Sequence, residues 1–340
     1  MEPADRTRWN QNHRGRVSAV GPGPRALKEW AAAQEAGLKT GTEIQFNNTC
    51  EIASVPYLPV MDLVAEHCHN LASAKLDAML IGWTMGGYPS PNFQLAQHAA
   101  RMASASALSR TPAPNVDSVL DALAQERFGP EGAPHARKAW TLMSDAFRQY
   151  PFHISVVYTS PVQCGPANAL HPSKTSYKAT MWGIPYDDLD GWRGPYPPEV
   201  FAAQFQKIAD GWRPGIAELQ TAVDKAPLDR RNEAQADLRL ARAAAIHFQS
   251  VANQTCFILA RDALANPSST LSPEERDRLR AEITRCLESE IDLARQLFTL
   301  VREDSRIGFE PSCQYFYLPL DLVEKVVNCR WLLERTKDEG

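Results

Sequence analysis

The chain has 340 residues, of which 44% are hydrophobic and 22% are charged. This hydrophobic fraction is enough for a sizeable core, and the length indicates two domains. The net charge is −4 and the isoelectric point is near 6.1, with no basic block, so nucleic acid is not expected as a partner. No apolar run is long enough to span a bilayer, and the polar N-terminus lacks the apolar core of a signal peptide, which predicts no membrane partner and favours a cytoplasmic location.

The seven cysteines are scattered along the chain, and no two have the Cys-x-x-Cys spacing of zinc sites. They are predicted to be free thiols in a reducing compartment. The segment His67–His69 reads His-Cys-His, but residues two apart on a helix point to different faces, so no metal is expected there. Without a ligand cluster or a glycine-rich phosphate loop, the sequence predicts no metal and no organic cofactor.

Short apolar runs alternate with helical patterns over the first 105 residues. Strands are predicted at 16–21, 42–48 and 78–83, and helices at 24–37, 59–74 and 92–105, the last of them capped by Asn92. Strands that are separated by helices of this length pair in parallel. Three such units leave open sheet edges, through which we expect self-association. The pattern fits either a small open sheet or the last three units of a (β/α)8 barrel whose start is missing.

The remainder of the chain is dominated by helical patterns, and the domain boundary is predicted near residue 112. The helices are expected at 115–129, 135–150, 199–223, 231–265, 273–303 and 320–334. Ser272 is predicted to cap the fifth of them, with Pro273 in its first position. Apolar residues at spacings of three and four predict an antiparallel helical bundle, interrupted by an irregular, aromatic-rich loop at 151–198.

Polar and aromatic side chains follow the second and third predicted strands. Asn47, Asn48 and Glu51 follow the second strand, and Trp83 and Tyr88 follow the third. In a barrel enzyme the active site lies at these carboxyl ends of the strands. Glu51 is therefore a candidate catalytic or substrate-binding carboxylate, and a flat Trp83 ring could stack on a sugar. The alternatives are that Glu51 forms a structural ion pair, that the asparagines cap and turn the loop, and that Trp83 closes the end of the barrel.

Two stretches carry a resemblance to a known group of enzymes. They are KTGTEIQFNNTCEIASVPYLPVMDLVAEH (39–67) and MLIGWTMGGYPSPN (79–92), and they resemble the end of a glycoside hydrolase (β/α)8 barrel of the hexosaminidase-like and α-glucuronidase-like group, more narrowly its uncharacterised bacterial members. Three later stretches, AWTLMSDAFRQYPF, GPANAL and DSRIGFEPSCQYFY, resemble the helical domain that follows such barrels. The resemblance extends from about Val17 to about Trp331. Cys50 stands where similar sequences are expected to have an aromatic residue, which weakens a stacking role there.

The resemblance implies a fold class of α/β followed by all-α, with the last three βα units of a truncated (β/α)8 barrel at 1–112 and a helical domain at 113–340. It implies a glycoside hydrolase, or the C-terminal part of one, that acts on carbohydrate by acid–base catalysis between two carboxyl groups. Glu51 would be catalytic, and Asn47, Asn48, Trp83 and Tyr88 would bind the sugar. Such barrels carry their acid pair on a middle strand, so an incomplete, inactive enzyme is also an open interpretation.

Two irregular segments in the second half hold further candidate residues. The run YKATMWGIPYDDLDGWRGPYPP (177–198) mixes aromatic residues with carboxylates, which suits carbohydrate recognition and equally suits a loop that is held by its own side chains. The segment EDSRIGFEPSCQYFY (303–317) interrupts two helices. There, Arg306 and Glu310 could reach a substrate, or an Arg–carboxylate bridge could hold the bundle together.

Two further functional classes compete with the glycosidase hypothesis. The main alternative is a non-catalytic carbohydrate-binding or assembly protein, in which the helical bundle makes the contacts. A small α/β hydrolase is disfavoured, because the sequence has no G-x-S-x-G nucleophile elbow.

Overall fold

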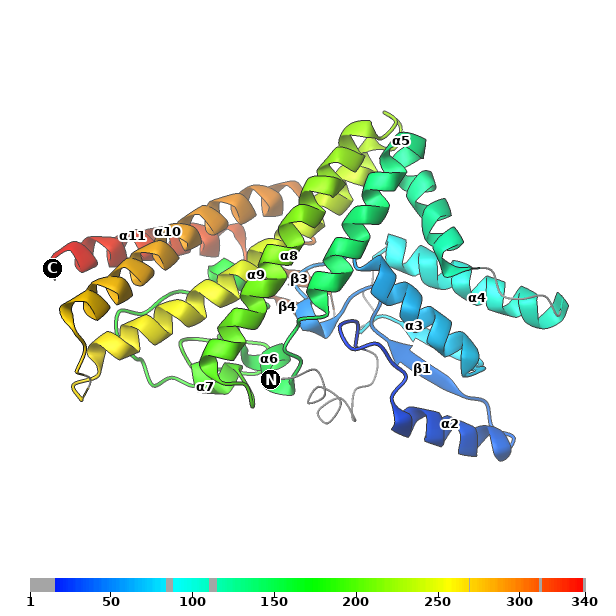
Figure 1. Ribbon diagram of the computed structural model, residues 1–340, viewed down its shortest axis with the longest axis horizontal. Coiled ribbons are helices and arrows are strands. Elements are labelled where there is room, and N and C mark those ends of the chain that lie inside the picture. The colour runs from blue at the N-terminus through cyan, green and yellow to red at the C-terminus, as the bar shows by residue number, and fades with distance from the viewer. Residues whose placement is uncertain (1–15, 84–87, 110–114, 269, 312–313, 339–340) are drawn as a thin grey trace. The chain divides into compact units, whose positions relative to one another are not determined.

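The computed structural model describes residues 16–83, 88–109, 115–268, 270–311 and 314–338 (Figure 1). The chain divides into two compact units, each assembled from separate segments. Unit 1 comprises Met1–Glu51, Pro56–Arg148 and Gly211–Ala241, and unit 2 comprises Ile52–Val55, Gln149–Asp210 and Arg242–Gly340. No helix among these described residues is both long and apolar enough to cross a membrane.

Unit 1 begins with alternating helices and short strands. In chain order its elements are α2 (Pro24–Glu35), β1 (Gly41–Ile44), the 3-10 helix η3 (Cys50–Ile52), α3 (Met61–Ser73), β2 (Ala78–Ile81), α4 (Pro91–Ser109) and α5 (Val116–Phe147). The strands β1 and β2 pair in parallel, with Gly41 opposite Ala78 and Ile44 opposite Ile81. The helix between them is the crossover that a parallel pair requires.

The predicted (β/α)8 barrel architecture is wrong. The described part of the chain is mostly helical, and the only strands of unit 1 within it form a two-stranded sheet. The first predicted strand, at 16–21, does not form there, because its amides bind side chains in place of a neighbouring strand. Val17 and Ser18 donate to the Glu51 carboxylate, and Gly21 donates to His67. The predicted second and third strands are present as the shorter β1 and β2.

The buried face of α3 supplies much of the core of unit 1. Leu63, Val64 and Leu71 lie on this face and are buried. The helix packs against α4 and α5, and the long axis of α5 is bent where Gly129 adopts a φ of 71° ahead of Pro130. Gly129 tolerates this left-handed conformation because it has no Cβ, and Pro130 has no amide to donate to the preceding turn. Gly129 therefore separates α5 into two helical segments.

Unit 2 is built mainly from long helices. Its elements include α6 (Ile154–Thr159), the 3-10 helix η4 (Gly165–Ala167), α7 (Leu189–Trp192), α10 (Pro273–Glu303), the two-residue strands β3 (Phe309–Glu310) and β4 (Gln314–Tyr315), and α11 (Pro319–Asp338). The helices α8 (Pro198–Lys225) and α9 (Arg231–Ala265) contribute residues to both units. Within unit 2, α10 and α11 lie side by side and run in opposite directions, as expected for a helical bundle (Figure 1).

Two predicted helix caps have different outcomes. Ser272 caps α10 as predicted, because its side chain accepts from the Glu275 amide while the Glu275 side chain accepts from the Ser272 amide. The cap at Asn92 is wrong: α4 begins at Pro91, and the hydroxyl of Ser90 accepts from the amide of Phe93. The Asn92 amide group instead donates to two backbone carbonyls elsewhere in unit 1. The caps at Ser272 and Ser90 bind backbone amides of the first helical turn, which have no partner inside the helix.

Candidate functional site

Glu51, the predicted catalytic carboxylate, is completely buried. Its Oε2 accepts hydrogen bonds from the Val17 amide at 2.9 Å and from the Thr49 hydroxyl at 3.0 Å. The Ser18 amide donates to Oε1 at 3.3 Å, and the Ser18 hydroxyl also donates to this oxygen. The carboxylate therefore anchors the segment at 16–21 through the amides of Val17 and Ser18, which pair with no strand.

The surroundings of Glu51 act on its pKa in two opposite directions. Burial raises the pKa of Glu51 above its ordinary value, although hydrogen bonds from Ser18 and Val17 and the nearby Arg16 charge act in the opposite direction. The neighbouring Cys50 carries no charge at neutral pH, because burial raises the pKa of its thiol to about 12. A carboxyl group with a raised pKa is the kind that donates a proton in glycoside hydrolysis. In this conformation, however, the Glu51 oxygens are shielded from solvent.

The two predicted sugar-binding asparagines hold neighbouring segments together. Asn47 Oδ1 accepts from the Ser90 hydroxyl at 2.5 Å, and Asn48 Oδ1 accepts from the Trp83 amide at 3.0 Å. Both asparagines are buried. Their contacts bring the segment after β1 and the segment after β2 to one edge of the small sheet, as the sequence pattern predicts for parallel strands.

The two predicted aromatic sugar contacts are more accessible than the asparagines. Trp83 and Tyr88 are both half-buried. The glycine pair that separates them in the sequence, Gly86–Gly87, lies outside the described residues. The structure thus places Trp83 next to Asn48, and the binding of a sugar by Trp83 and Tyr88 stays a prediction.

A small cavity lies beside the segment that Glu51 anchors. It has a volume of about 250 Å³ and is lined by Ala19, Gly21, Pro22, Gly23, Ala26, Glu29, Trp30, Gly41, Thr42, Glu43, Ile44, His67 and Leu71. Burial lowers the pKa of His67 to about 4, so the ring is neutral at pH 7, and its Nδ1 accepts from the Gly21 amide at 3.2 Å. Because typical ligand pockets measure about 300–1,000 Å³, this cavity would take only a small molecule.

Arg306 and Glu310, the other predicted substrate contacts, lie in unit 2. The Arg306 guanidinium binds both oxygens of Asp304, with distances of 2.7 Å from Nε to Oδ1 and 2.6 Å from Nη2 to Oδ2. Asp304 is the C-cap residue of α10, so this Arg–carboxylate bridge joins two residues of one helix end, and a bridge that holds the bundle together stays a prediction. Glu310 is buried in β3. A role for either residue in substrate binding stays a prediction.

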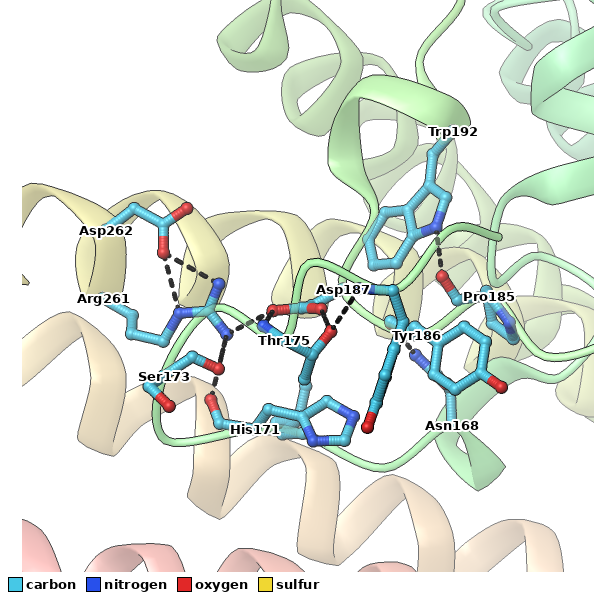
Figure 2. Close-up of polar contacts among 12 residues, drawn as sticks. Asn168, His171, Ser173, Thr175, Pro185, Tyr186, Asp187, Trp192, Arg261 and Asp262 are labelled. Carbon is cyan, nitrogen blue, oxygen red and sulfur yellow. Dashed lines mark hydrogen bonds and ion pairs between the residues drawn. The ribbon is translucent and has the colours of Figure 1, made fainter. Parts of the chain in front are cut away.

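The aromatic-rich loop of unit 2 is fixed by a buried ion pair (Figure 2). Arg261 Nη1 lies 2.8 Å from Asp187 Oδ2 and also donates to the carbonyl oxygens of His171 and Ser173. The amide of Thr175 donates to the same carboxylate at 3.1 Å, and its hydroxyl donates to the other oxygen. Burial alone would raise the pKa of Asp187, but the Thr175 and Arg261 contacts together lower it below its ordinary value.

Further contacts hold the second half of this loop. The indole of Trp192 is completely buried and donates to the Pro185 carbonyl at 2.8 Å, and Asn168 donates to the Tyr186 carbonyl at 2.9 Å (Figure 2). Asp188 accepts from the Ala179 amide at 3.0 Å. These contacts agree with the second interpretation of the run at 177–198, in which the loop is held in place by its own side chains.

Sequence reasoning missed the partners that complete this arrangement. Arg261 lies in the long helical pattern at 231–265, where a charged residue every few positions is usual. Thr175 precedes the aromatic run at 177–198. The cavity residue Trp30 was also missed, although it lies on the predicted helix at 24–37. Among the residues described, no group of three or more His, Cys, Asp or Glu side chains is arranged to hold a metal ion.

Comparisons with known proteins give a likeness of fold. No family model matches the chain, and no curated protein matches it. The solved structure of a GH138 enzyme targeting pectin rhamnogalacturonan II is similar over 97% of this chain, with a TM-score of 0.51 and 11% sequence identity. The chain spans 52% of that protein's length. At this identity the likeness concerns the fold alone, and the chain therefore resembles in fold about half of that enzyme.

Proposed function

We propose that the chain is a carbohydrate-active protein of the glycoside hydrolase type. The observation that carries this proposal is the likeness of fold to a GH138 enzyme over nearly the whole chain. Since one fold can host unrelated functions, the likeness supports the proposal only together with the local chemistry. That chemistry is a buried carboxyl group with a raised pKa in unit 1 and an aromatic-rich loop in unit 2.

Glu51 is the proposed proton donor. Its raised pKa suits a group that must hold a proton until the glycosidic oxygen takes it during cleavage. For Glu51 to reach a sugar, the segment that carries Val17 and Ser18 must move away from the carboxyl oxygens. Asn47, Asn48, Trp83 and Tyr88 are the proposed sugar contacts of the same region. Within unit 2, Arg306 and Glu310 are proposed substrate contacts.

The test is sugar release from pectin rhamnogalacturonan II and from a panel of aryl glycosides and uronides by the full chain. We expect turnover by the wild type and a loss of about 100-fold or more in Glu51→Gln, because general acid catalysis contributes about 10²–10⁴-fold. Glu66→Gln is the matched control, since Glu66 is an exposed carboxylate that pairs with Arg148 on the surface of unit 1. Full activity of a folded Glu51→Gln variant would remove Glu51 from the mechanism.

A second candidate function is carbohydrate binding without catalysis. The complete burial of Glu51 and its bonds to two backbone amides favour this alternative, because they give the carboxylate a structural role. Binding of the same saccharides without release of sugar, unchanged in affinity by Glu51→Gln, would support it. Self-association through an open sheet edge also stays a prediction, and sedimentation of the purified chain would test it.

A further inference from the structure

The aromatic-rich loop of unit 2 is held in an unusual backbone conformation. Ser176, Trp182 and Tyr186 have φ values of 63°, 58° and 52°. These values lie in the left-handed region of the backbone, which residues other than glycine rarely adopt. Across the part of the chain that the structure describes, Lys75 is the only other non-glycine residue in this region. Such strain persists only where surrounding contacts enforce it, and it is concentrated at binding and active sites.

The enforcing contacts act on the backbone of the loop. The Trp182 amide donates to the Tyr158 carbonyl at 3.0 Å, and the Tyr186 carbonyl accepts from Asn168. The Asp187–Arg261 ion pair closes the base of the loop directly after Tyr186 (Figure 2). The two strained aromatic residues are thus fastened through their main chains as well as through the contacts of their rings.

The aromatic rings of the loop lie in two groups of ring contacts, and some side chains near them are exposed. Tyr177 and Tyr186 have ring centroids 5.2 Å apart, and Trp182 lies 4.6 Å from Tyr158 and 5.9 Å from Phe316 between ring centroids. Three side chains at the tip are exposed: Tyr177 by 61%, Met181 by 69% and Ile184 by 56%. Trp192, at the end of the same loop, is completely buried and serves as an anchor, whereas the Tyr177 ring is exposed and anchoring alone does not account for it.

We infer that the tip residues Tyr177, Met181, Trp182, Ile184 and Tyr186 form a saccharide-binding platform in unit 2, separate from the residues around Glu51. This inference rests on the proposed function for its ligand class. Aromatic faces with hydroxyl groups at their edges suit sugar rings, which have apolar C–H faces and polar rims. A rigid platform also binds without an ordering cost. Five tip residues are too few for a stable protein interface, which needs about 20–30 residues a side.

The test measures binding of the full chain to oligosaccharides of pectin rhamnogalacturonan II and to cellohexaose, by calorimetry and by retardation in polysaccharide-containing gels. Tyr177→Ala is expected to weaken binding to at least one probe by about tenfold, the equivalent of one lost ring contact. Tyr177→Phe, which keeps the ring, is expected to bind within about twofold of the wild type. Trp331→Ala removes a partly exposed aromatic from α11 and is the matched control, with unchanged binding expected.

The outcomes separate this inference from the proposed hydrolysis. Weaker binding by Tyr177→Ala supports the platform even if the chain releases no sugar, in which case only the hydrolysis fails. Hydrolysis with undiminished binding by Tyr177→Ala overturns the platform alone. The platform is also overturned if neither probe binds the wild type, if Trp331→Ala weakens binding as much as Tyr177→Ala, or if Tyr177→Ala instead abolishes an association between copies of the chain.

Discussion

Lys325 of α11 and Glu290 of α10 form an ion pair with 2.8 Å between Nζ and Oε2, and both side chains are completely buried. Both side chains also form hydrogen bonds with other residues. Lys325 donates to the Asn168 carbonyl at 2.6 Å, and Glu290 accepts from Ser250 and Asn253. The pair therefore connects two neighbouring helices of unit 2 to Asn168 in its aromatic-rich loop.

Replacing only one member of this pair should be costly. Lys325→Met leaves the Glu290 carboxylate buried without its counter-charge, and we expect a loss of about 3–5 kcal/mol in the free energy of unfolding, measured by urea titration. The double variant Lys325→Met/Glu290→Gln should recover part of the loss, because it buries no charge. A single variant within about 1 kcal/mol of the wild type would contradict a stabilising role for the pair.

The ion pair beneath the aromatic-rich loop gives a second prediction. Arg261→Ala removes the counter-charge of buried Asp187 and should lower the free energy of unfolding by about 3 kcal/mol. The comparison is Arg193→Ala in the same loop, whose partner Asp190 is largely exposed, so a loss below about 1 kcal/mol is expected. Equal losses in the two variants would show that the buried pair does not hold the loop.

Acid should weaken the same contact. The pKa of Asp187 is lowered in the fold, so its stabilising contribution is present above the carboxyl's ordinary pKa of 3.8 and is lost as the pH falls through the lower folded value. In Arg261→Ala this part of the pH dependence should shrink. Unfolding titrations of both proteins from pH 5 downward would measure the difference.

His247 gives a third prediction, at higher pH. It is completely buried, its Nδ1 lies 2.7 Å from the Val162 carbonyl and its Nε2 lies 2.8 Å from the Tyr317 hydroxyl. Burial lowers its pKa from 6.5 to about 4, so the stability that neutral His247 contributes is complete above pH 6.5 and falls as the pH drops towards 4. The total loss is about 3 kcal/mol, from about 1.4 kcal/mol for each pH unit.

The measurement for His247 is unfolding free energy as a function of pH. His247→Gln should lose stability at neutral pH and should show a flatter profile between pH 6.5 and 4, because the titrating group is gone. His69→Gln is the control, since His69 is exposed on α3. A profile for His247→Gln with the slope of the wild type would contradict the prediction.

Gly165 gives a fourth prediction, because its neighbour is the same imidazole. Its φ is 52°, and a Cβ added there would lie 2.9 Å from His247 Nδ1. Gly165→Ala should therefore destabilise the chain by more than the roughly 1–2 kcal/mol of the left-handed conformation alone. Gly23→Ala, where a Cβ would meet nothing within 4 Å, should cost less than about 1 kcal/mol. Thermal melts of both variants would check the contrast.

The sequence predicts individual helices and strands of this chain better than their assembly. The long helices follow from apolar spacing and from local signals such as the Ser272 cap, which acts within four residues. The strands β1 and β2 follow from short apolar runs. The barrel does not follow, because pairing is a long-range property: the run at 16–21 reads as a strand, yet its amides find Glu51 and His67 instead.

The candidate site shows the same limit. The carboxyl ends of parallel strands correctly bring Asn48 and Trp83 together. The burial of Glu51 could not be read from the sequence, since it depends on a segment that contacts it from more than 30 residues away. Likewise, the aromatic run at 177–198 does not reveal that Arg261, from a distant helix, would hold its base.

The bonds between Glu51 and the segment before α2 have a consequence for hydrogen exchange. Val17 and Ser18 belong to no helix or strand, and amides in such stretches usually exchange with solvent quickly. Here both amides are bonded to a buried carboxylate, so they should exchange slowly. Deuterium uptake at these two positions would therefore report whether a single side chain is in place, even in variants that have no measurable activity.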